Sequence, residues 1–168
     1  MPEPWPKDIL KTEVKEATKR LDLAKESVAF ISKLIGEVSF VVMRGNVEYK
    51  QVPLYLSGAD CLMLTSDYEG SPNIIKEALA CNLPIVSVDV GDVRERLEGV
   101  NPSQIVTRDP KAIGMAMAEI ITSCQRSNGR KHVSKISAVV VRDKILRVYN
   151  FIIWLSLQHK KRKIGEYN

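Results

Sequence analysis

Apolar and polar residues alternate along the chain in segments of two kinds. Short runs of branched apolar residues bounded by turn residues predict strands buried on both faces, and they cover residues 38–43, 61–65, 84–88 and 105–107. Longer segments whose apolar residues recur every three or four positions predict helices packed on a sheet, and they cover residues 21–35, 52–57, 111–122 and 137–157. This alternation predicts an α/β fold, a Rossmann-like parallel sheet with helices on both faces in a single domain.

The stretch 69–77 joins two of these strands and runs from the carboxyl end of the first into a helix. Ser71 is a favoured N-cap, and Pro72 suits the first helical position, where no amide hydrogen is missed. The backbone amides of Asn73 and Ile74 would then be free, with the positive end of the helix dipole behind them. This arrangement predicts an anion site that suits phosphate.

Two more residues of the stretch bear on the ligand. Gly70 lets a ligand come close to the backbone. Glu77 shares a helix face with Asn73 through their four-residue spacing. A carboxylate there repels a phosphate but accepts hydrogen bonds from sugar or ribose hydroxyls. The stretch therefore predicts a site for a phosphate beside a polyol, and the carboxyl ends of parallel strands are where such ligands bind.

The same stretch carries a family resemblance. Glu69 and Glu77, separated by seven residues, with the segment 78–87 that follows, closely resemble the glutamate-x7-glutamate motif of retaining glycosyltransferases of the GT-B fold, family 4. The resemblance covers about residues 19–150. It implies the C-terminal, donor-binding half of a GT-B fold, which transfers a hexose from a nucleoside-diphosphate sugar to a hydroxyl acceptor with retention. It also implies no catalytic metal and no cofactor beyond the donor, a UDP-, GDP- or ADP-sugar.

The resemblance assigns roles to particular residues. The catalytic role falls to Glu69, and the ribose is held by Glu77. Contacts to the donor sugar and phosphates are expected from Gly70, Ser71, Asn73, Ile74, Lys19 and Arg20. The nucleobase is expected at the loop that contains Arg44 and Asn46, where Arg44 either stacks on the base or only solvates the preceding strand end.

The main departure from the family pattern lies near the N-terminus. Family members have a strand there, followed by a loop whose basic residues hold the donor diphosphate. Residues 7–20 are charged and contain no convincing strand, although Lys19 and Arg20 stand where the loop should be. These two side chains are therefore either diphosphate ligands or the solvated start of the next helix.

Composition places the chain among soluble globular proteins. It has 168 residues, of which 45% are hydrophobic and 27% charged, enough for one domain with a proper core. The three cysteines have no metal-like spacing and predict buried thiols in a reducing cytoplasm. We find no signal-peptide pattern and no apolar run of the roughly 20 residues that a membrane span needs. The expected location is cytoplasmic.

Positive charge is concentrated at the C-terminal end. The formal net charge is +5, and residues 125–168 contain 11 Lys plus Arg against 2 acids, so this segment carries +9 and the remainder −4. The apolar segment 151–155 is followed by the basic segment 159–163. This pairing suits peripheral contact with the anionic inner face of a membrane, or a helix that covers a neighbouring domain. Nucleic acid is not an expected partner, because no recognition motif accompanies the charges.

The expected organisation has three parts: an irregular or divergent leader at 1–18, the sugar-nucleotide-binding domain at 19–150, and the end of the last helix with the basic tail at 151–168. GT-B enzymes close two domains around the donor, and 168 residues hold one. The expected partners are thus a nucleotide sugar and a missing N-terminal acceptor domain or partner subunit. The alternative function is a non-catalytic module that binds nucleotide sugar and depends on a separate acceptor domain.

Overall fold

A computed structural model of the chain describes residues 19–43 and 47–165, with side chains as far as residue 156. The chain divides into two compact units, Met1–His132 and Val133–Asn168. This division falls earlier than the boundary expected after Asn150. The expected leader at residues 1–18 lies outside the described residues.

A parallel sheet forms the centre of the first unit. Its strands are β1 (Leu62–Leu64), β2 (Ile85–Val88) and β3 (Gln104–Val106), in the order β1-β2-β3. Every residue of β2 is buried, and the hydroxyl of Ser87, its one polar residue, donates to the carbonyl of Val88 at 2.7 Å. Three of the predicted strands and the parallel sheet are therefore confirmed.

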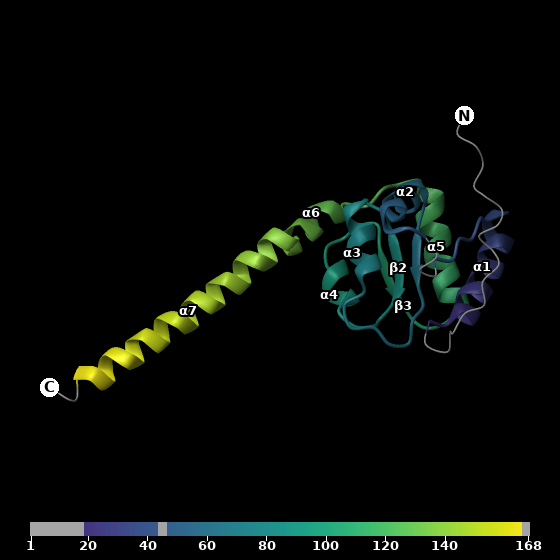
Figure 1. Cartoon of the computed structure of the whole chain (residues 1–168). Coiled ribbons are helices and arrows are strands. Elements are labelled where there is room, and N and C mark those ends of the chain that lie inside the picture. The colour runs from purple at the N-terminus through teal and green to yellow at the C-terminus, as the bar shows by residue number, and fades with distance from the viewer. Residues whose placement is uncertain (1–18, 44–46, 166–168) are drawn as a thin grey trace. The chain divides into compact units, whose positions relative to one another are not determined.

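Helices cover both faces of this sheet, as the alternating pattern predicted. Figure 1 shows α3 (Asn73–Ala80) and α4 (Val93–Leu97) on one side, and α5 (Pro110–Ser123) and α1 (Leu21–Ile35) on the other. The first unit is thus a small Rossmann-like α/β domain.

Close contact between α1 and α5 depends on Gly114. A Cβ at this position would lie 2.6 Å from Cδ1 of Phe30 and 3.3 Å from the carbonyl oxygen of Ser27. The hydroxyl of Ser27 is itself buried and donates to the carbonyl of Leu23 one turn earlier, at 2.8 Å. At the start of α5, the carboxylate of Asp109 accepts from the amide of Ala112 at 2.8 Å, a side-chain cap that fixes the first turn.

The expected strand at 38–43 is wrong. Residues 37–43 are described, and none of them belongs to a strand. Their side chains are half-buried or exposed, with Val41 41% exposed, whereas β2 is buried throughout. An apolar run resembles a strand in sequence whether or not a neighbouring strand pairs with it, and here the ladder is missing. The chain continues through a short 3-10 turn, η2 (Tyr49–Gln51), into α2 (Val52–Gly58).

The segment after α5 ties several helix ends together. The guanidinium of Arg126 donates to the carbonyls of Ala59 at 2.6 Å, Cys81 at 3.0 Å and Leu56 at 3.3 Å. The guanidinium of Arg130 donates to the carbonyl of Ala80 at 2.7 Å. These carbonyls lie at the ends of α2 and α3, where intrahelical donors run out. A short helix, α6 (Gly129–Val133), begins within this segment.

The second unit consists of a 3-10 turn, η3 (Ser134–Ile136), and the long helix α7 (Ala138–Gly165). This helix runs eight residues beyond the predicted end at residue 157, because the intervening Lys, Arg and Gln residues favour a helix and the next glycine is Gly165. None of the described helices is both long enough and apolar enough to span a bilayer.

Candidate donor-binding site

The loop after β1 lies at the carboxyl edge of the sheet and is bound to the start of α1. Thr65 and Ser66 are buried. The hydroxyl of Thr65 is placed to donate to the carbonyl oxygens of Lys19 at 3.0 Å and Arg20 at 3.1 Å. Two segments 45 residues apart in sequence therefore meet at the place where ligands of such sheets bind.

Lys19 and Glu69 form an ion pair across this junction, between Nζ and Oε1. The side chain of Glu69 is 16% exposed and that of Lys19 57% exposed. Arg20 adopts the left-handed conformation, with φ 50°, and its guanidinium hydrogen-bonds the carboxylate of Asp22 at 2.9 Å. That hydrogen bond, with the charge of Asp22, raises the pKa of Arg20 and lowers that of Asp22. The structure thus brings one expected diphosphate ligand, Lys19, against the expected catalytic carboxylate, whereas the guanidinium of Arg20 pairs with Asp22 and Asp67.

Asp67 and Arg108 form a second link that the sequence did not reveal. Arg108 follows β3, and its Nε lies 3.1 Å from Oδ1 of Asp67. Its Nη2 also donates to the carbonyls of Ser66 at 2.9 Å and Asp67 at 3.1 Å. Asp67 in turn lies 3.6 Å from Nη1 of Arg20. The available signal was position alone, since both Asp67 and Arg108 closely follow strands of one parallel sheet.

The start of α3 differs from the prediction by one residue. Pro72 is the N-cap, with an extended ψ of 122°, and α3 begins at Asn73. Ser71 does not cap the helix: its hydroxyl donates to Oδ2 of Asp92 at 2.6 Å. No side chain caps this terminus, so the first amides, those of Asn73 and Ile74, lack both an intrahelical acceptor and a side-chain acceptor.

Lys76 adds positive charge to the first turn of α3. Its ammonium group donates to the carbonyl of Ser71 and to Oδ1 of Asn73, each at 3.3 Å. Sequence reasoning did not select this residue, although a lysine in the first turn beside a phosphate site is a direct signal. Together with the free amides, it makes this helix start suited to an anion.

Gly91 allows the loop after β2 to pack against the loop after β1. Its φ is +55°, and a Cβ there would overlap the carbonyl oxygen of Gly70 and lie 2.8 Å from that of Glu69. The amide of Asp92 donates to the Gly70 carbonyl at 3.0 Å. A Cβ at Gly70, in contrast, would have no atom within 4 Å. Gly70 therefore faces open space, and Gly91 supports the backbone behind it.

Asp92 is held by charge and hydrogen bonds. Arg96, one turn later in α4, donates to its Oδ2 from Nε at 2.8 Å, in addition to the bond from Ser71. Burial raises the pKa of Asp92, but the hydrogen bonds from Ser71 and Arg96 and the charges of Arg96 and Lys76 outweigh it, so the net pKa lies below the ordinary value. The other carboxylate oxygen, Oδ1, is buried with no hydrogen-bond partner among the described residues.

The remaining predicted residues lie apart from these contacts. Glu77 is half-buried on the second turn of α3, and its carboxylate forms no hydrogen bond or ion pair with another described residue. Arg44 and Asn46 lie outside the described residues, so their expected nucleobase role stays a prediction. Within the described part of the chain, no group of three or more His, Cys, Asp or Glu side chains is placed to hold a metal ion.

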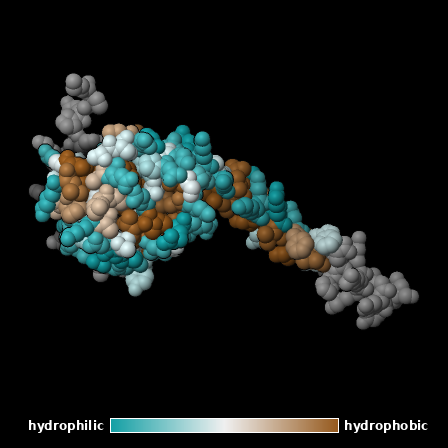
Figure 2. Space-filling model, turned by 180° about the vertical axis from the view of Figure 1, so that it is seen from behind, coloured by the Kyte–Doolittle hydropathy of each residue, from teal (hydrophilic) through white to brown (hydrophobic). Residues whose placement is uncertain are grey.

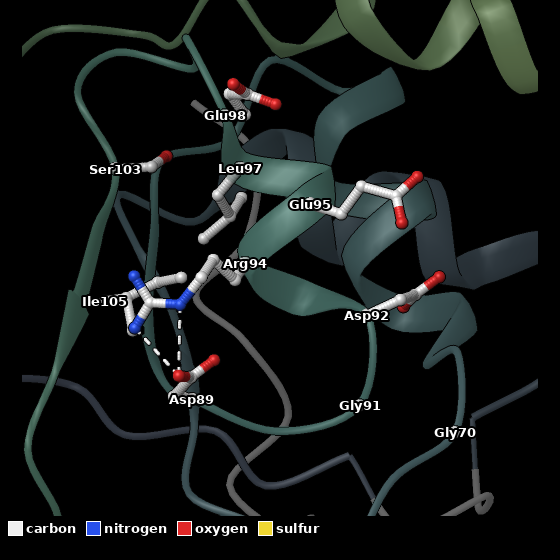
Figure 3. A pocket seen from close by; sticks show the side chains of 10 residues that line it. All are labelled: Gly70, Asp89, Gly91, Asp92, Arg94, Glu95, Leu97, Glu98, Ser103 and Ile105. Carbon is white, nitrogen blue, oxygen red and sulfur yellow. Dashed lines mark hydrogen bonds and ion pairs between the residues drawn. The ribbon is translucent and has the colours of Figure 1, made fainter.

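An open pocket of about 920 Å³ borders the site on the side of α4. Figure 3 shows Gly70, Gly91 and Asp92 at one edge, with the guanidinium of Arg94 turned toward Asp89, which it contacts at 2.8 Å. Four carboxylates and one guanidinium line the pocket, contributed by Asp89, Asp92, Glu95, Glu98 and Arg94. This negative balance makes it a poor place for a diphosphate, which the side with Lys19, Arg20 and Lys76 suits better.

Comparison with known proteins gives consistent matches. Residues 17–123 match the family described as Glycosyl transferases group 1. The chain is 26% identical over 125 residues to the 2-deoxystreptamine N-acetyl-D-glucosaminyltransferase of Streptomyces fradiae, which covers 74% of this chain and 28% of that protein. It is 38% identical over 81 residues to the putative teichuronic acid biosynthesis glycosyltransferase TuaC of Bacillus subtilis (strain 168), which covers 48% of this chain and 20% of that protein.

No solved structure matches the chain significantly. The matched part of the chain spans about a quarter of the length of the two curated relatives named above. The family match covers well over half of the chain and includes Lys19, Arg20 and the whole stretch from Glu69 to Glu77. This chain belongs to the group 1 glycosyl transferases.

Proposed function

We propose that this chain is the donor-binding domain of a retaining GT-B glycosyltransferase of family 4, which transfers a hexose from a nucleoside-diphosphate sugar to a hydroxyl. The observation that carries the proposal is the ion pair between Lys19 and Glu69, in the loop that leads to the uncapped start of α3. A basic group, a carboxylate and free amides are then within one site. They suit two parts of the donor: the sugar hydroxyls, and the diphosphate whose distal phosphate is bonded to the sugar.

In this proposal the donor diphosphate lies between the basic side chains and the helix start. The amides of Asn73 and Ile74 bind the distal phosphate, and Lys19 and Arg20 neutralise its charge. The diphosphate competes with Glu69 for Lys19, and the released carboxylate of Glu69, with the backbone of Gly70 and Ser71, binds the donor sugar. Glu77 accepts hydrogen bonds from the ribose, and its lack of a described partner leaves it free to do so.

The reaction breaks the bond between the anomeric carbon and the phosphate oxygen. The electron pair leaves with the nucleoside diphosphate, whose developing charge the amides and basic side chains stabilise. The acceptor hydroxyl forms the new bond to the anomeric carbon on the same face and gives its proton to the departing phosphate. A double displacement through a covalent bond to Glu69 is the less favoured route.

The acceptor side is proposed to come from a further domain, on the same polypeptide or as a partner subunit. The matched regions cover only 28% and 20% of the two relatives. The second candidate function is accordingly a nucleotide-sugar-binding module that does not transfer sugar unless that domain is supplied.

Calorimetric titration of the chain tests the proposal. The wild type and two variants are titrated with UDP, GDP and ADP and with their glucose and mannose conjugates. One variant is Glu77→Ala; the other, Glu26→Ala, is the control and removes an exposed carboxylate from α1. We expect saturable binding of one nucleotide class that weakens about tenfold or more in Glu77→Ala, since a charge-assisted hydrogen bond is worth about 1.5–3 kcal/mol, and is unchanged in Glu26→Ala. Binding of none of these ligands, or equal binding by both variants, contradicts the proposed site.

A further inference from the structure

An apolar cluster on α7 has no partner among the described residues. It comprises five consecutive side chains that are 43–59% exposed: Phe151, Ile152, Ile153, Trp154 and Leu155. The rings of Phe151 and Trp154 stack, with their centroids 6.2 Å apart. Figure 2 shows apolar side chains, in brown, along the described part of this helix. Exposed apolar surface of this kind marks an interaction site.

The arrangement of the cluster argues against a single partner helix. Consecutive residues of an α-helix are 100° apart, so five of them occupy every side of α7. A coiled-coil partner covers one seam that repeats every 3.5 residues. Ile152 and Leu155 fit such a seam, but Trp154 and Ile153 would stay in water. A medium that surrounds the helix on several sides covers the cluster better.

The positive charge at the end of α7 indicates which medium this is. α7 continues as a helix to Gly165 and carries the basic run Lys160–Lys163. At 1.5 Å per residue, Lys160 lies about 9 Å beyond Trp154 along the axis. A second copy aligned in parallel would bring two such runs together, and like charges would repel. Anionic phospholipid headgroups would neutralise them.

We propose that α7 binds the surface of an anionic lipid bilayer. Residues 151–155 enter the headgroup and upper acyl region, and Lys160–Lys163 bind the lipid phosphates. Interfacial helices lie in the plane of the bilayer and are buried about 5–10 Å deep, and because a helix with its side chains is about 10–12 Å across, this depth covers side chains on most of its sides. A tryptophan at the apolar edge is favoured there, because its ring is apolar and its N–H remains near water. This proposal is independent of the donor site.

Vesicle binding by the full chain tests the proposal. The chain is mixed with vesicles of phosphatidylcholine containing about one third phosphatidylglycerol, or with phosphatidylcholine alone, and the bound fraction is measured by sedimentation. Trp5, the other of the two tryptophans in the sequence, is replaced by phenylalanine so that emission reports Trp154 only. We expect binding to the anionic vesicles, a blue shift of Trp154 emission, and loss of binding at high salt.

A charge-matched pair of variants separates a local basic site from net charge. The test variant replaces four residues of α7 with glutamine: Lys160, Lys161, Arg162 and Lys163. The control variant makes the same change at four exposed lysines of the first unit: Lys25, Lys33, Lys50 and Lys111. Each variant loses four charges, from +5 to +1. We expect the test variant to bind anionic vesicles about 100-fold to 1000-fold more weakly and the control to keep most of its binding.

Several outcomes overturn the proposal. Failure of the wild type to bind the anionic vesicles does so directly, and equal loss in both variants shows only non-specific attraction. Binding without a shift of Trp154 emission means that the apolar cluster does not enter the lipid. A chain that is dimeric in solution, with Trp154 emission already blue-shifted before vesicles are added, means that a second copy covers α7. Far-UV circular dichroism confirms that the variants keep their helix content.

Discussion

Replacement of Gly91 by alanine should disturb both the fold and the site. Two separate costs follow from the structure. The φ of +55° places an alanine in the left-handed region, which costs about 1–2 kcal/mol. The new Cβ would also overlap the carbonyl of Gly70 and lie 2.8 Å from that of Glu69, and forced backbone shifts of this kind cost about 1–3 kcal/mol. The expected loss in the free energy of unfolding is about 2–5 kcal/mol.

Two glycine controls separate these costs. Gly36 has φ +92° and no atom within 4 Å of a Cβ, so Gly36→Ala should carry conformational strain alone, about 1–3 kcal/mol, without a change in nucleotide affinity. Gly70 has neither a positive φ nor a close neighbour. Gly70→Ala should therefore keep the wild-type stability within about 1 kcal/mol, but weaken nucleotide-sugar binding, because its methyl group enters the space proposed for the ligand.

Urea denaturation followed by circular dichroism measures stability, and calorimetry measures affinity. For an m-value of about 2 kcal/mol/M, Gly91→Ala should lower the urea midpoint by about 1 M or more. Its nucleotide affinity should also fall, since the displaced carbonyls belong to Glu69 and Gly70. A midpoint for Gly91→Ala equal to that of Gly70→Ala would refute the reasoning, because it would mean that the two loops do not pack as closely as the structure shows.

Three other predictions concern side chains around the sheet edge. Arg108→Gln should lower the free energy of unfolding by about 1–3 kcal/mol, because it removes hydrogen bonds to the loop after β1, and it should weaken nucleotide binding. As a control, Arg94→Gln breaks an exposed ion pair and should change the free energy of unfolding by less than about 1 kcal/mol. The pKa of Asp92 is below its ordinary value of 3.8, so its stabilising contribution should be complete above about pH 4 and be lost as the pH falls through the folded-state pKa; a urea-midpoint series against pH should lose this acid-side slope in Asp92→Asn. Burial raises the pKa of the Cys61 thiol to about 12. In the native chain at pH 8 a thiol reagent should therefore label the exposed Cys124 and leave Cys61 unmodified. Fast labelling of Cys61 would mean that its environment is open.

The sequence predicted the parts of the fold that depend on local pattern. Helix α1 has the bounds expected from its apolar spacing, and it ends where Gly36 interrupts the pattern. Helix α5 lies within one residue of the expected 111–122 at each end, because its apolar residues recur at helical spacing. The segment 38–43 misled the prediction, because a strand needs a partner, and an apolar run does not reveal whether a neighbouring strand pairs with it.

The sequence selected the loop of the candidate site but not the contacts within it, and the functional roles of its residues stay a prediction. Glu69 and its loop were found from the strand-to-helix transition and the family motif. Ser71 was assigned to the helix start, although it bonds a residue 21 positions away. The bonds of Arg108 to Asp67 join residues 41 positions apart. Nothing in a local pattern encodes contacts of this length, so the polar network that holds the loop could be seen only in three dimensions.

The helix-end contacts of Arg126 and Arg130 bear on where this domain stops. The match to the family model ends at residue 123, yet residues 126 and 130 donate to the carbonyls at the ends of α2 and α3. A chain cut at the limit of similarity would expose these carbonyls and lose the packing of Gly129 against Leu79. The compact unit that contains these contacts ends at His132, so experiments on the isolated domain should extend at least through that residue.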